Sequence, residues 1–421
     1  MKKKNIFQII ALLLIFILLS GCQNIVTKDI PTQRSAKNTN NTPTKDELRW
    51  SWIVEPGKYD DLFFIDNELI ATKNNKGKYI VINTSGEVVI HHEYDSISKF
   101  IEGVALVNVD GKFSYIDNNG LPITNDEYQD GDHFSESLAA VKQNDMWGFV
   151  DLSGDLRIEC QFEDVRSFIE NRAAVKLDSK WGFINNSGEM LVIPQFEQVE
   201  SFADGISAVR FNNKWGFIDS VGNVLVDFQY DEVKNFHEGF AAVMKNNKWG
   251  FININGEVCI DFKYDDAGNF SEGKASVKLS NCIEGMDAWA YIDKDDNIVI
   301  DFYPYNASEG RMVWVGEFED GIAFVSKPLY CVINSQGENV FLSDSKFFIS
   351  ALTYNSRLDV IPGYIYIDDK MTIRKYGLMG LEGNQRLEPV FDYIGELNDE
   401  YVIVENVLDG VYKKGIIKLL F

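Results

Sequence analysis

Four consecutive stretches of the chain repeat one phrase: LAAVKQNDMWGFVDLSGDLRIECQFEDVRSFIEN at 138–171, RAAVKLDSKWGFINNSGEMLVIPQFEQVESFADG at 172–205, ISAVRFNNKWGFIDSVGNVLVDFQYDEVKNFHEG at 206–239 and FAAVMKNNKWGFININGEVCIDFKYDDAGNFSEG at 240–273. Each phrase contains WGF followed by Val or Ile, and other aromatic residues continue the same 34-residue spacing upstream. This aromatic ladder consists of Tyr79, Phe113, Trp147, Trp181, Trp215 and Trp249. A fixed period of about 20 to 50 residues is the signature of a repeat array.

The residues of each unit favour strands, although helical repeats also use a period of about 34 residues. Apolar residues stand in short runs that alternate or are β-branched, such as MLVIP at 190–194 and VLVDF at 224–228. Turn signals interrupt these runs every few residues, whereas a helix needs apolar residues three and four apart over roughly ten positions. The chain is therefore predicted to be all-β and built of tandem β-hairpin repeats.

A tight turn is predicted after each WGF-type strand. An Asn or Asp stands four residues after the ladder aromatic, and in most units a Gly follows three residues later. An Asx side chain accepts hydrogen bonds from the backbone ahead of it, and Gly adopts the left-handed conformation that the turn requires. The turns begin at Asn83, Asp117, Asp151, Asn185, Asp219, Asn253, Asp293 and Asn334. After Asp293 the register is expected to slip to Asn297. Half of these positions are Asn without further acidic ligands, so neither calcium nor another metal is predicted.

The repeated side chains are predicted to build the fold. Within each WGFI strand, Trp and Phe share one face, and Gly shares the other with Ile. The bare Gly is expected to lie against a phenylalanine of an adjacent strand or repeat, drawn from Phe100, Phe134, Phe168, Phe202, Phe236 and Phe270. The acid of the following acid–Gly phrase, as at Glu238, is expected to accept backbone N–H bonds at a second turn. The functional alternatives are a charged rim and a sugar-stacking tryptophan platform, but a residue found in every unit usually serves the unit's own fold.

Ten units are counted in all, the last one truncated. Residues 49–275 hold the regular repeats, and residues 276–421 hold divergent repeats with insertions near 280–287, 303–316 and 343–369. The ladder equivalents in the divergent part are Trp289, Tyr330, Tyr376 and Lys414, at spacings of 40, 41, 46 and 38. Units of this size suit a propeller-like toroid or arc. Ten units are many for one closed ring, so an open β-solenoid is the alternative.

The KWGFI phrase, the Asx-x-x-Gly turn, the following Tyr or Phe with its acid, and the F-x-[ED]-G phrase together resemble the bacterial WG-repeat family. The resemblance is strong over residues 70–275 and weak over 276–421. It departs from the pattern in the first two units, where KYIVI at 78–82 and KFSYI at 112–116 replace WGFI. Such a resemblance implies an all-β repeat array, usually without an assigned enzymatic activity, and it transfers no catalytic residue to this sequence.

The N-terminus carries a targeting segment. Three lysines at positions 2–4 precede an apolar run from Ile6 to Leu19, which is short for a membrane span of roughly 20 residues. The run ends in Leu19-Ser20-Gly21-Cys22, which resembles the bacterial lipoprotein lipobox and implies cleavage before Cys22 and lipid on its sulfur. An ordinary signal peptide with a chance cysteine is the alternative. Residues 1–21 are thus expected to be a lipoprotein signal peptide and residues 22–48 a lipidated cysteine with a flexible tether, which places the protein outside the cytoplasm on the cell membrane.

Net charge, cysteine and histidine positions and the lack of catalytic motifs argue against several functions. A formal net charge of −24 argues against binding nucleic acid and against lying flat on anionic lipid. Cys160, Cys259, Cys282 and Cys331 occupy different repeat positions and include no CxxC, so single buried thiols are expected, although their pairing stays open. The four histidines, at positions 91, 92, 133 and 237, form no motif. No nucleotide fingerprint, GxSxG or HExxH is present, and no cofactor is predicted.

The sequence leaves three alternative functions for this protein. The favoured one is a membrane-anchored, extracytoplasmic binding or scaffold protein without catalysis. It would contact the membrane through the lipid on Cys22 and bind a protein or glycan ligand where insertions interrupt the repeats. The second is a cell-wall or glycan binder that uses exposed aromatics, for which Trp50, Trp52 and Trp314 lie outside the repeat phase and are expected to be exposed. The third, less favoured, is a propeller-type glycosidase, which needs unique convergent carboxylates.

Overall fold

The computed structural model describes residues 48–59, 61–124, 127–283, 286–305, 315–326, 330–342, 348–349, 360–366, 373–381, 385–398 and 400–420. The chain divides into two compact units, Met1–Lys45 and Asp46–Phe421. All described residues belong to the second unit, and their regular structure consists of strands and turns. Among these residues no helix is long and apolar enough to cross a membrane.

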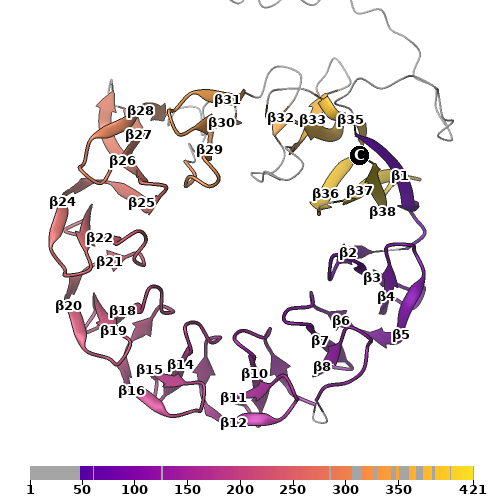
Figure 1. Cartoon of the computed structure of the whole chain (residues 1–421), viewed down its shortest axis with the longest axis horizontal. Coiled ribbons are helices and arrows are strands. Elements are labelled where there is room, and N and C mark those ends of the chain that lie inside the picture. The colour runs from indigo at the N-terminus through magenta and orange to yellow at the C-terminus, as the bar shows by residue number, and fades with distance from the viewer. Residues whose placement is uncertain are drawn as a thin grey trace, which may run out of the picture. The chain divides into compact units, whose positions relative to one another are not determined.

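The strands of the second unit form ten small antiparallel sheets, which we number as blades 1 to 10 along the chain (Figure 1). Blades 1 to 5 contain β2 (Leu62–Phe64), β3 (Leu69–Lys73), β4 (Tyr79–Asn83) and β5 (Val88–Tyr94); β6 (Ser96–Ile97), β7 (Val104–Val109) and β8 (Lys112–Asp117); β9 (Asp130–Gly131), β10 (Leu138–Gln143), β11 (Met146–Asp151) and β12 (Leu156–Phe162); β13 (Asp164–Val165), β14 (Arg172–Leu177), β15 (Lys180–Asn185) and β16 (Met190–Phe196); and β17 (Gln198–Val199), β18 (Ile206–Phe211), β19 (Lys214–Asp219) and β20 (Val224–Tyr230).

Blades 6 to 10 contain β21 (Glu232–Val233), β22 (Phe240–Lys245), β23 (Lys248–Asn253) and β24 (Val258–Tyr264); β25 (Asp266–Ser271), β26 (Lys274–Ile283), β27 (Met286–Ile292) and β28 (Ile298–Tyr305); β29 (Ile322–Ser326), β30 (Tyr330–Asn334) and β31 (Asn339–Leu342); β32 (Phe348–Ile349), β33 (Ile361–Tyr366), β34 (Arg374–Met379) and β35 (Gln385–Phe391); and β36 (Tyr393–Leu397), β37 (Tyr401–Leu408) and β38 (Val411–Leu420), joined by β1 (Arg49–Val54). In the regular blades the last strand, such as β16, β20 or β24, lies at the perimeter (Figure 1).

The last blade takes its outer strand from the beginning of the unit. β1 pairs antiparallel with β38, with Arg49 opposite Leu420 and Ser51 opposite Lys418. The predicted truncation of the last unit is confirmed, because that unit supplies only β36, β37 and β38, and β1 completes blade 10 as its outer strand. Pairing of the two ends of an array in one sheet removes the exposed terminal blades that an open array would have.

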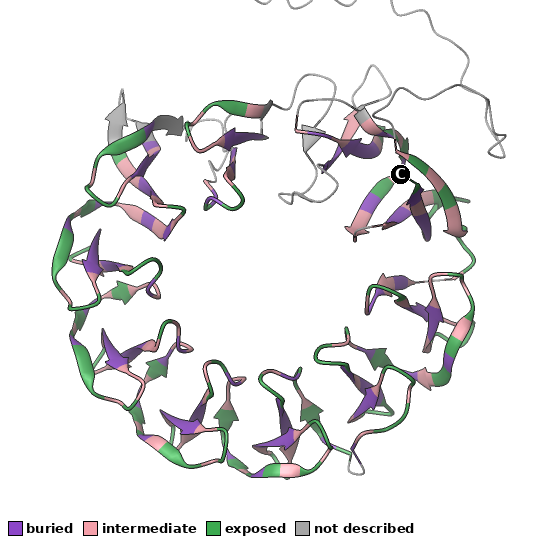
Figure 2. Ribbon diagram, viewed as in Figure 1, coloured by how far each residue is buried: buried purple, intermediate pink, exposed green. Residues whose placement is uncertain are grey.

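A hydrophobic cluster fills each of the ten interfaces between neighbouring blades, including the interface between blades 10 and 1. Between blades 3 and 4, for example, Phe149 and Phe162 meet Phe168 and Ile184. The buried residues concentrate on the middle strands of each blade, and the perimeter strands are mostly exposed (Figure 2). The all-β propeller prediction is thus confirmed in its closed form, and the open solenoid is not formed.

The Asx turns form as the sequence predicts. Asn185 accepts hydrogen bonds from the N–H groups of Ser187 and Glu189 at 3.0 and 2.9 Å, and Gly188 has a φ of +81°. The turn at Asp293 corrects one expectation, because its register does not slip. Asp296 adopts the left-handed conformation itself, with a φ of 65°.

The predicted contact between the ladder glycines and the repeated phenylalanines is wrong, because each of the two residues packs against a different neighbour. Phe134, Phe168, Phe202, Phe236 and Phe270 are buried as expected, and Phe100 is half-buried. Phe202 packs edge-on against Phe183 of the preceding blade, with ring centroids 4.8 Å apart. The space beside Gly182 is taken by the backbone of the next strand, since an added Cβ would lie 2.3 Å from the Val192 carbonyl oxygen. The glycine therefore allows two backbones to approach at the bulge in β16, where the ladder register shifts.

The three predicted insertions are only partly described. The first lengthens the hairpin of β26 and β27, which pair as far as Ile283 opposite Met286. The other two lie mostly outside the described residues, as does Trp314.

Candidate functional surfaces

A first ring of acids occupies the two-residue turns between the first and second strands of the blades. Glu170, in the turn of blade 4, accepts a hydrogen bond from the Gly205 N–H in the turn of blade 5 at 2.9 Å. Glu238 does the same for Gly273 of the next blade at 3.0 Å. The same contact is made by Glu102, Glu136 and Glu272. The predicted capping of backbone N–H groups is confirmed, but each acid caps the turn of its neighbour and so links two blades.

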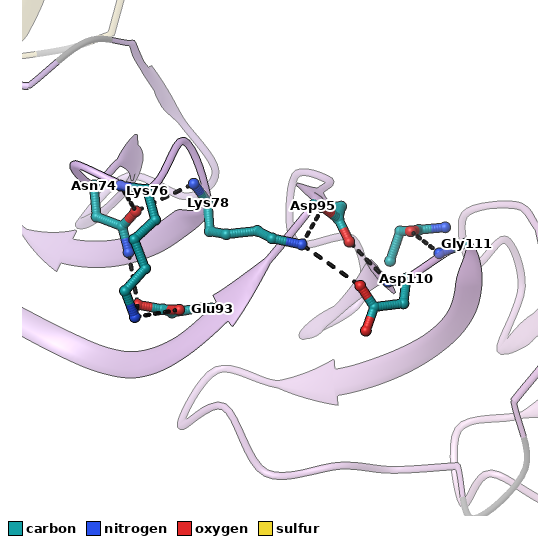
Figure 3. A network of polar contacts seen from close by, with 8 residues as sticks. Asn74, Lys76, Lys78, Glu93, Asp95, Asp110 and Gly111 are labelled. Carbon is teal, nitrogen blue, oxygen red and sulfur yellow. Dashed lines mark hydrogen bonds and ion pairs between the residues drawn. The ribbon is translucent and has the colours of Figure 1, made fainter.

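A second set of acids lies where one blade leads into the next. Figure 3 shows Asp95, which accepts a hydrogen bond from the Asp110 N–H at 2.7 Å and contacts the Lys78 ammonium. Lys78 belongs to blade 1 and Asp110 to a turn of blade 2, so the contact spans the interface. Equivalent carboxylates that accept a backbone N–H are Glu163, Glu197, Asp231, Asp265 and Asp392. The donors to the last two, Ser280 and Val407, lie within strands β26 and β37. Both sets of repeated acids are therefore occupied in fastening blades together.

At Asp95 and Asp231 these contacts favour the ionised carboxylate. The Lys78 ammonium and the Asp110 N–H lower the pKa of Asp95 below its ordinary value, and Lys214 with the Asn246 N–H does the same to the pKa of Asp231. A general acid at neutral pH requires a raised carboxyl pKa. The lowered pKa values of Asp95 and Asp231 thus suit turn fixation rather than proton donation.

The closing interface repeats the same ion pair between the two ends of the unit. Lys414 of blade 10 lies 2.7 Å from an Asp61 oxygen just before blade 1, and the Tyr79 hydroxyl donates to the other oxygen at 2.9 Å. Partial burial opposes ionisation of Asp61, but the hydrogen bonds from Lys414 and Tyr79 outweigh it and lower the pKa of Asp61. Burial and the contact with Asp61 raise the pKa of Tyr79 to about 12. This Asp61 contact fixes the closure from both blades.

The ladder tryptophans pack as core residues, which confirms the structural interpretation. Trp147, Trp181 and Trp215 are half-buried against the clusters between blades, and Trp249 is 7% exposed. Lysine ammonium groups lie 5.8 Å from the ring centroids of both Trp147 and Trp181. The repeated indole faces therefore serve the fold and its covering lysines.

The expected exposure of Trp50 and Trp52 is wrong. Both are half-buried on β1, with ring centroids 5.2 Å apart, and both contact the ring of Phe391. They pack on the cluster between blades 9 and 10. Sequence reasoning missed this burial because it did not place β1 within the last blade.

The cysteines and histidines are scattered over the described surface. His91, His92, His133 and His237 are all exposed. Cys160 is half-buried and Cys259 is exposed, both as free thiols, while Cys331 is buried between blades 7 and 8. The side chains of Cys22 and Cys282 lie outside the described residues. Within the described part of the chain, no group of three or more His, Cys, Asp or Glu is placed to hold a metal ion.

One surface feature was not predicted from the sequence. The hairpin between β37 and β38 ends in the exposed Asp409-Gly410 turn. Four exposed apolar side chains flank this turn: Val407, Leu408, Val411 and Tyr412. The available signal was the spacing of 38 between Tyr376 and Lys414, four residues longer than the regular period. We call these four residues the apolar tip.

Several solved structures match the chain at low sequence identity. A crystal structure of the eukaryotic initiation factor matches at 9% identity over 76% of this chain and 94% of that chain, with a TM-score of 0.48. PorZ, a bacterial surface component of the type-IX secretion system of Porphyromonas gingivalis, matches at 9% identity over 85% of this chain and 58% of that chain, with a TM-score of 0.24. KlHsv2 with loop 6CD replaced by a Gly-Ser linker matches at 10% identity over 76% and 97%, with a TM-score of 0.27.

No curated protein matches the chain. A family model described as WG containing repeat matches seven segments, which together cover more than half of the chain: residues 81–113, 113–147, 147–181, 181–215, 215–249, 249–281 and 376–406. These segments contain the ladder aromatics from Phe113 to Trp249, the Asx turns from Asn83 to Asn253 and both sets of repeated inter-blade acids. The chain therefore belongs to the WG-repeat family.

Proposed function

We propose that the protein is a lipid-anchored, extracytoplasmic scaffold that binds a protein or glycan ligand on its propeller and performs no catalysis. The observation that carries the anchor is the phrase Leu19-Ser20-Gly21-Cys22, placed directly after a basic start and an apolar run. A segment rich in Asn, Thr and Lys then leads to β1, which suits a tether between lipid and propeller.

The arrangement of the acids supports binding rather than catalysis. Hydrolysis of a glycoside needs two carboxylates that face one bond with different protonation states. The recurring carboxylates of the described residues instead accept backbone N–H groups, as Glu170 does from Gly205 and Asp95 from Asp110. Because the repeated carboxylates already bind backbone groups, we expect ligands to bind at other surface residues and at the insertions, as is common in repeat proteins.

Metabolic labelling with a fatty acid tests the anchor. The wild-type protein should incorporate the label and fractionate with the membrane until detergent is added, whereas Cys22→Ser should incorporate none. Cys259→Ser is the matched control, because it removes an exposed thiol of the propeller, and it should label as the wild type does. A wild-type protein that carries no lipid would contradict the proposed anchor.

Surface cross-linking followed by capture tests the binding role. The wild type should capture a reproducible protein or wall-glycan partner, and shortening the chain within 303–316 or 343–369 should remove part of that set. Retention of wall polysaccharide that is lost on Trp314→Ala would favour the glycan alternative, and release of sugar from that polysaccharide would favour a glycosidase. An empty capture, or one unchanged by both shortened variants, would count against the scaffold.

A further inference from the structure

The hairpin of β37 and β38 departs from the regular blades in length. In blades 3 to 6 the equivalent hairpin ends one residue pair beyond the ladder position, as at Gln143 opposite Met146. In blade 10 two further pairs follow, Val407 opposite Tyr412 and Leu408 opposite Val411. The hairpin is thus four residues longer than those of blades 3 to 6, and these four residues are the apolar tip.

The apolar tip is exposed on both faces of the hairpin. The exposed fractions are 41% for Val407, 44% for Leu408, 55% for Val411 and 63% for Tyr412. Successive residues of a strand point to opposite faces, and directly opposed residues share one. One face therefore carries Val407 with Tyr412, and the other carries Leu408 with Val411.

We propose that the apolar tip inserts into the interface of a lipid bilayer and gives the protein a second membrane contact. A flat protein partner would cover one face of the hairpin and leave the other apolar face in water. A bilayer surrounds both faces, and the gain grows with the apolar area buried. The tyrosine suits this position, because its ring is apolar and its hydroxyl reaches the headgroup level.

Lysines lie beside the tip. Lys413 follows Tyr412 directly, and the exposed Lys58 lies in the loop that packs against the hairpin. The contact is close, since a Cβ added to Gly57 would lie 3.4 Å from Leu408 Cδ1 and 3.8 Å from Lys413 Cγ. Lysine stems extend along apolar surface while their ammonium groups stay in the headgroup region. The contact is confined to one hairpin, so it avoids bringing the acidic body flat against the lipid.

The proposal rests on the proposed lipid anchor for the nearness of a bilayer. β1, which the tether enters, and the hairpin belong to the same blade. The segment from Cys22 to Leu48 reaches about 85 Å when extended, whereas the ten residues of β38 span about 34 Å. The anchor therefore allows the tip to meet the same bilayer, and two weak contacts on one chain reinforce each other through their effective concentration.

Vesicle flotation of the unlipidated chain from residue 23 tests the tip apart from the anchor. This chain keeps the whole compact unit Asp46–Phe421, with its closing strand and all ten interfaces. It should float with phosphatidylcholine vesicles, with little change when phosphatidylglycerol is added. Val411→Asp with Tyr412→Asp should lower the vesicle partition coefficient at least about tenfold, because two apolar groups at the interface become charged.

Val109→Asp is the matched control. Val109 ends the equivalent hairpin strand of blade 2 and is 39% exposed, so this variant should float as the wild type does. Tyr412→Ala should give a smaller loss, which keeps the proposal testable if the double variant unfolds.

Several results would overturn the proposal. They are absence of flotation with both vesicle types, an equal loss with Val109→Asp, binding that requires phosphatidylglycerol and vanishes in high salt, and self-association that the tip variants abolish. Failure of the anchor gives a different pattern, in which the fatty-acid label on Cys22 is missing while flotation of the unlipidated chain persists.

Discussion

Gly182→Ala should destabilise the propeller because the added Cβ meets backbone. At the ideal position it lies 2.3 Å from the Val192 carbonyl oxygen and 2.7 Å from the Pro194 nitrogen. Contacts below 3.0 Å are essentially never seen for a real Cβ, and neither atom belongs to a flexible side chain. β15 and β16 must therefore move apart by more than half an ångström.

The size of the effect follows from this displacement. Overpacking of a tight interior costs about 1–3 kcal/mol, and loosening a ladder hydrogen bond beside the bulge adds about 1 kcal/mol. The expected loss is about 2–4 kcal/mol, or a fall in Tm of roughly 4 to 8 °C for a large domain. Gly205→Ala is the control: its φ is +73° and open space surrounds its Cβ, so only the left-handed conformation costs, about 1–2 kcal/mol.

Differential scanning calorimetry of the single variants and of Gly182→Ala with Phe202→Ala separates the explanations. If Phe202 filled the space at the glycine, its removal would relieve the added methyl. Because Phe202 packs on Phe183 instead, we expect no relief in the double variant. A Gly182→Ala protein as stable as the wild type, or one rescued by Phe202→Ala, would refute the reasoning.

Three further predictions concern the inter-blade acids. Glu170→Ala should cost about 1–2 kcal/mol and speed hydrogen exchange at the Gly205 amide, and an unchanged exchange rate would exclude the cap. The pKa of Asp231 is lower in the folded state than in the unfolded chain. The ionised carboxylate therefore contributes fully to stability above the unfolded-state pKa, near pH 4, and this contribution is lost as the pH falls through the folded-state pKa. Asp231→Asn should flatten the acid side of a plot of Tm against pH, and an unaltered acid side would contradict this. Asp61→Asn should bring the pKa of Tyr79 down from about 12, which ultraviolet titration measures, and a phenol that still titrates near 12 would show that Asp61 is not the cause.

The local features of the blades could be predicted because each depends on a few neighbouring residues. The period of 34 gave the units, and Asn185 with Gly188 gave a turn whose hydrogen bonds are those expected. The acid of the Glu238-Gly239 phrase was correctly assigned to a backbone N–H, although the donor lies in the next blade. A repeat specifies such contacts whenever both partners recur in every unit.

Closure could not be predicted, because its partners recur nowhere else. β1 and β38 stand at opposite ends of the unit, and Trp50 and Trp52 have no equivalents in the ladder. Their burial depends on a pairing that no local pattern encodes, so their expected exposure failed with it. The partner of Gly182 was missed for a related reason, since the missing side chain shows that space is needed but does not show which neighbour takes it.

The apolar tip could not be located from the irregular spacing of the last repeat. The interval from Tyr376 to Lys414 is four residues too long, but the sequence alone does not say which turn is lengthened. The register of β37 with β38 places the surplus at one hairpin end, where the four side chains are exposed together.

The most direct test of the closed ring is an engineered disulfide between β1 and β38. Ser51 and Lys418 lie directly opposite each other, so Ser51→Cys with Lys418→Cys should oxidise within one chain to near completion, as mass spectrometry of the linked peptides would show. Tyr401→Cys with Lys418→Cys is the control, because that pair faces across β37 and β38 whether or not the ring closes. A control that oxidises beside a β1 pair that stays reduced, or links only between chains, would contradict closure.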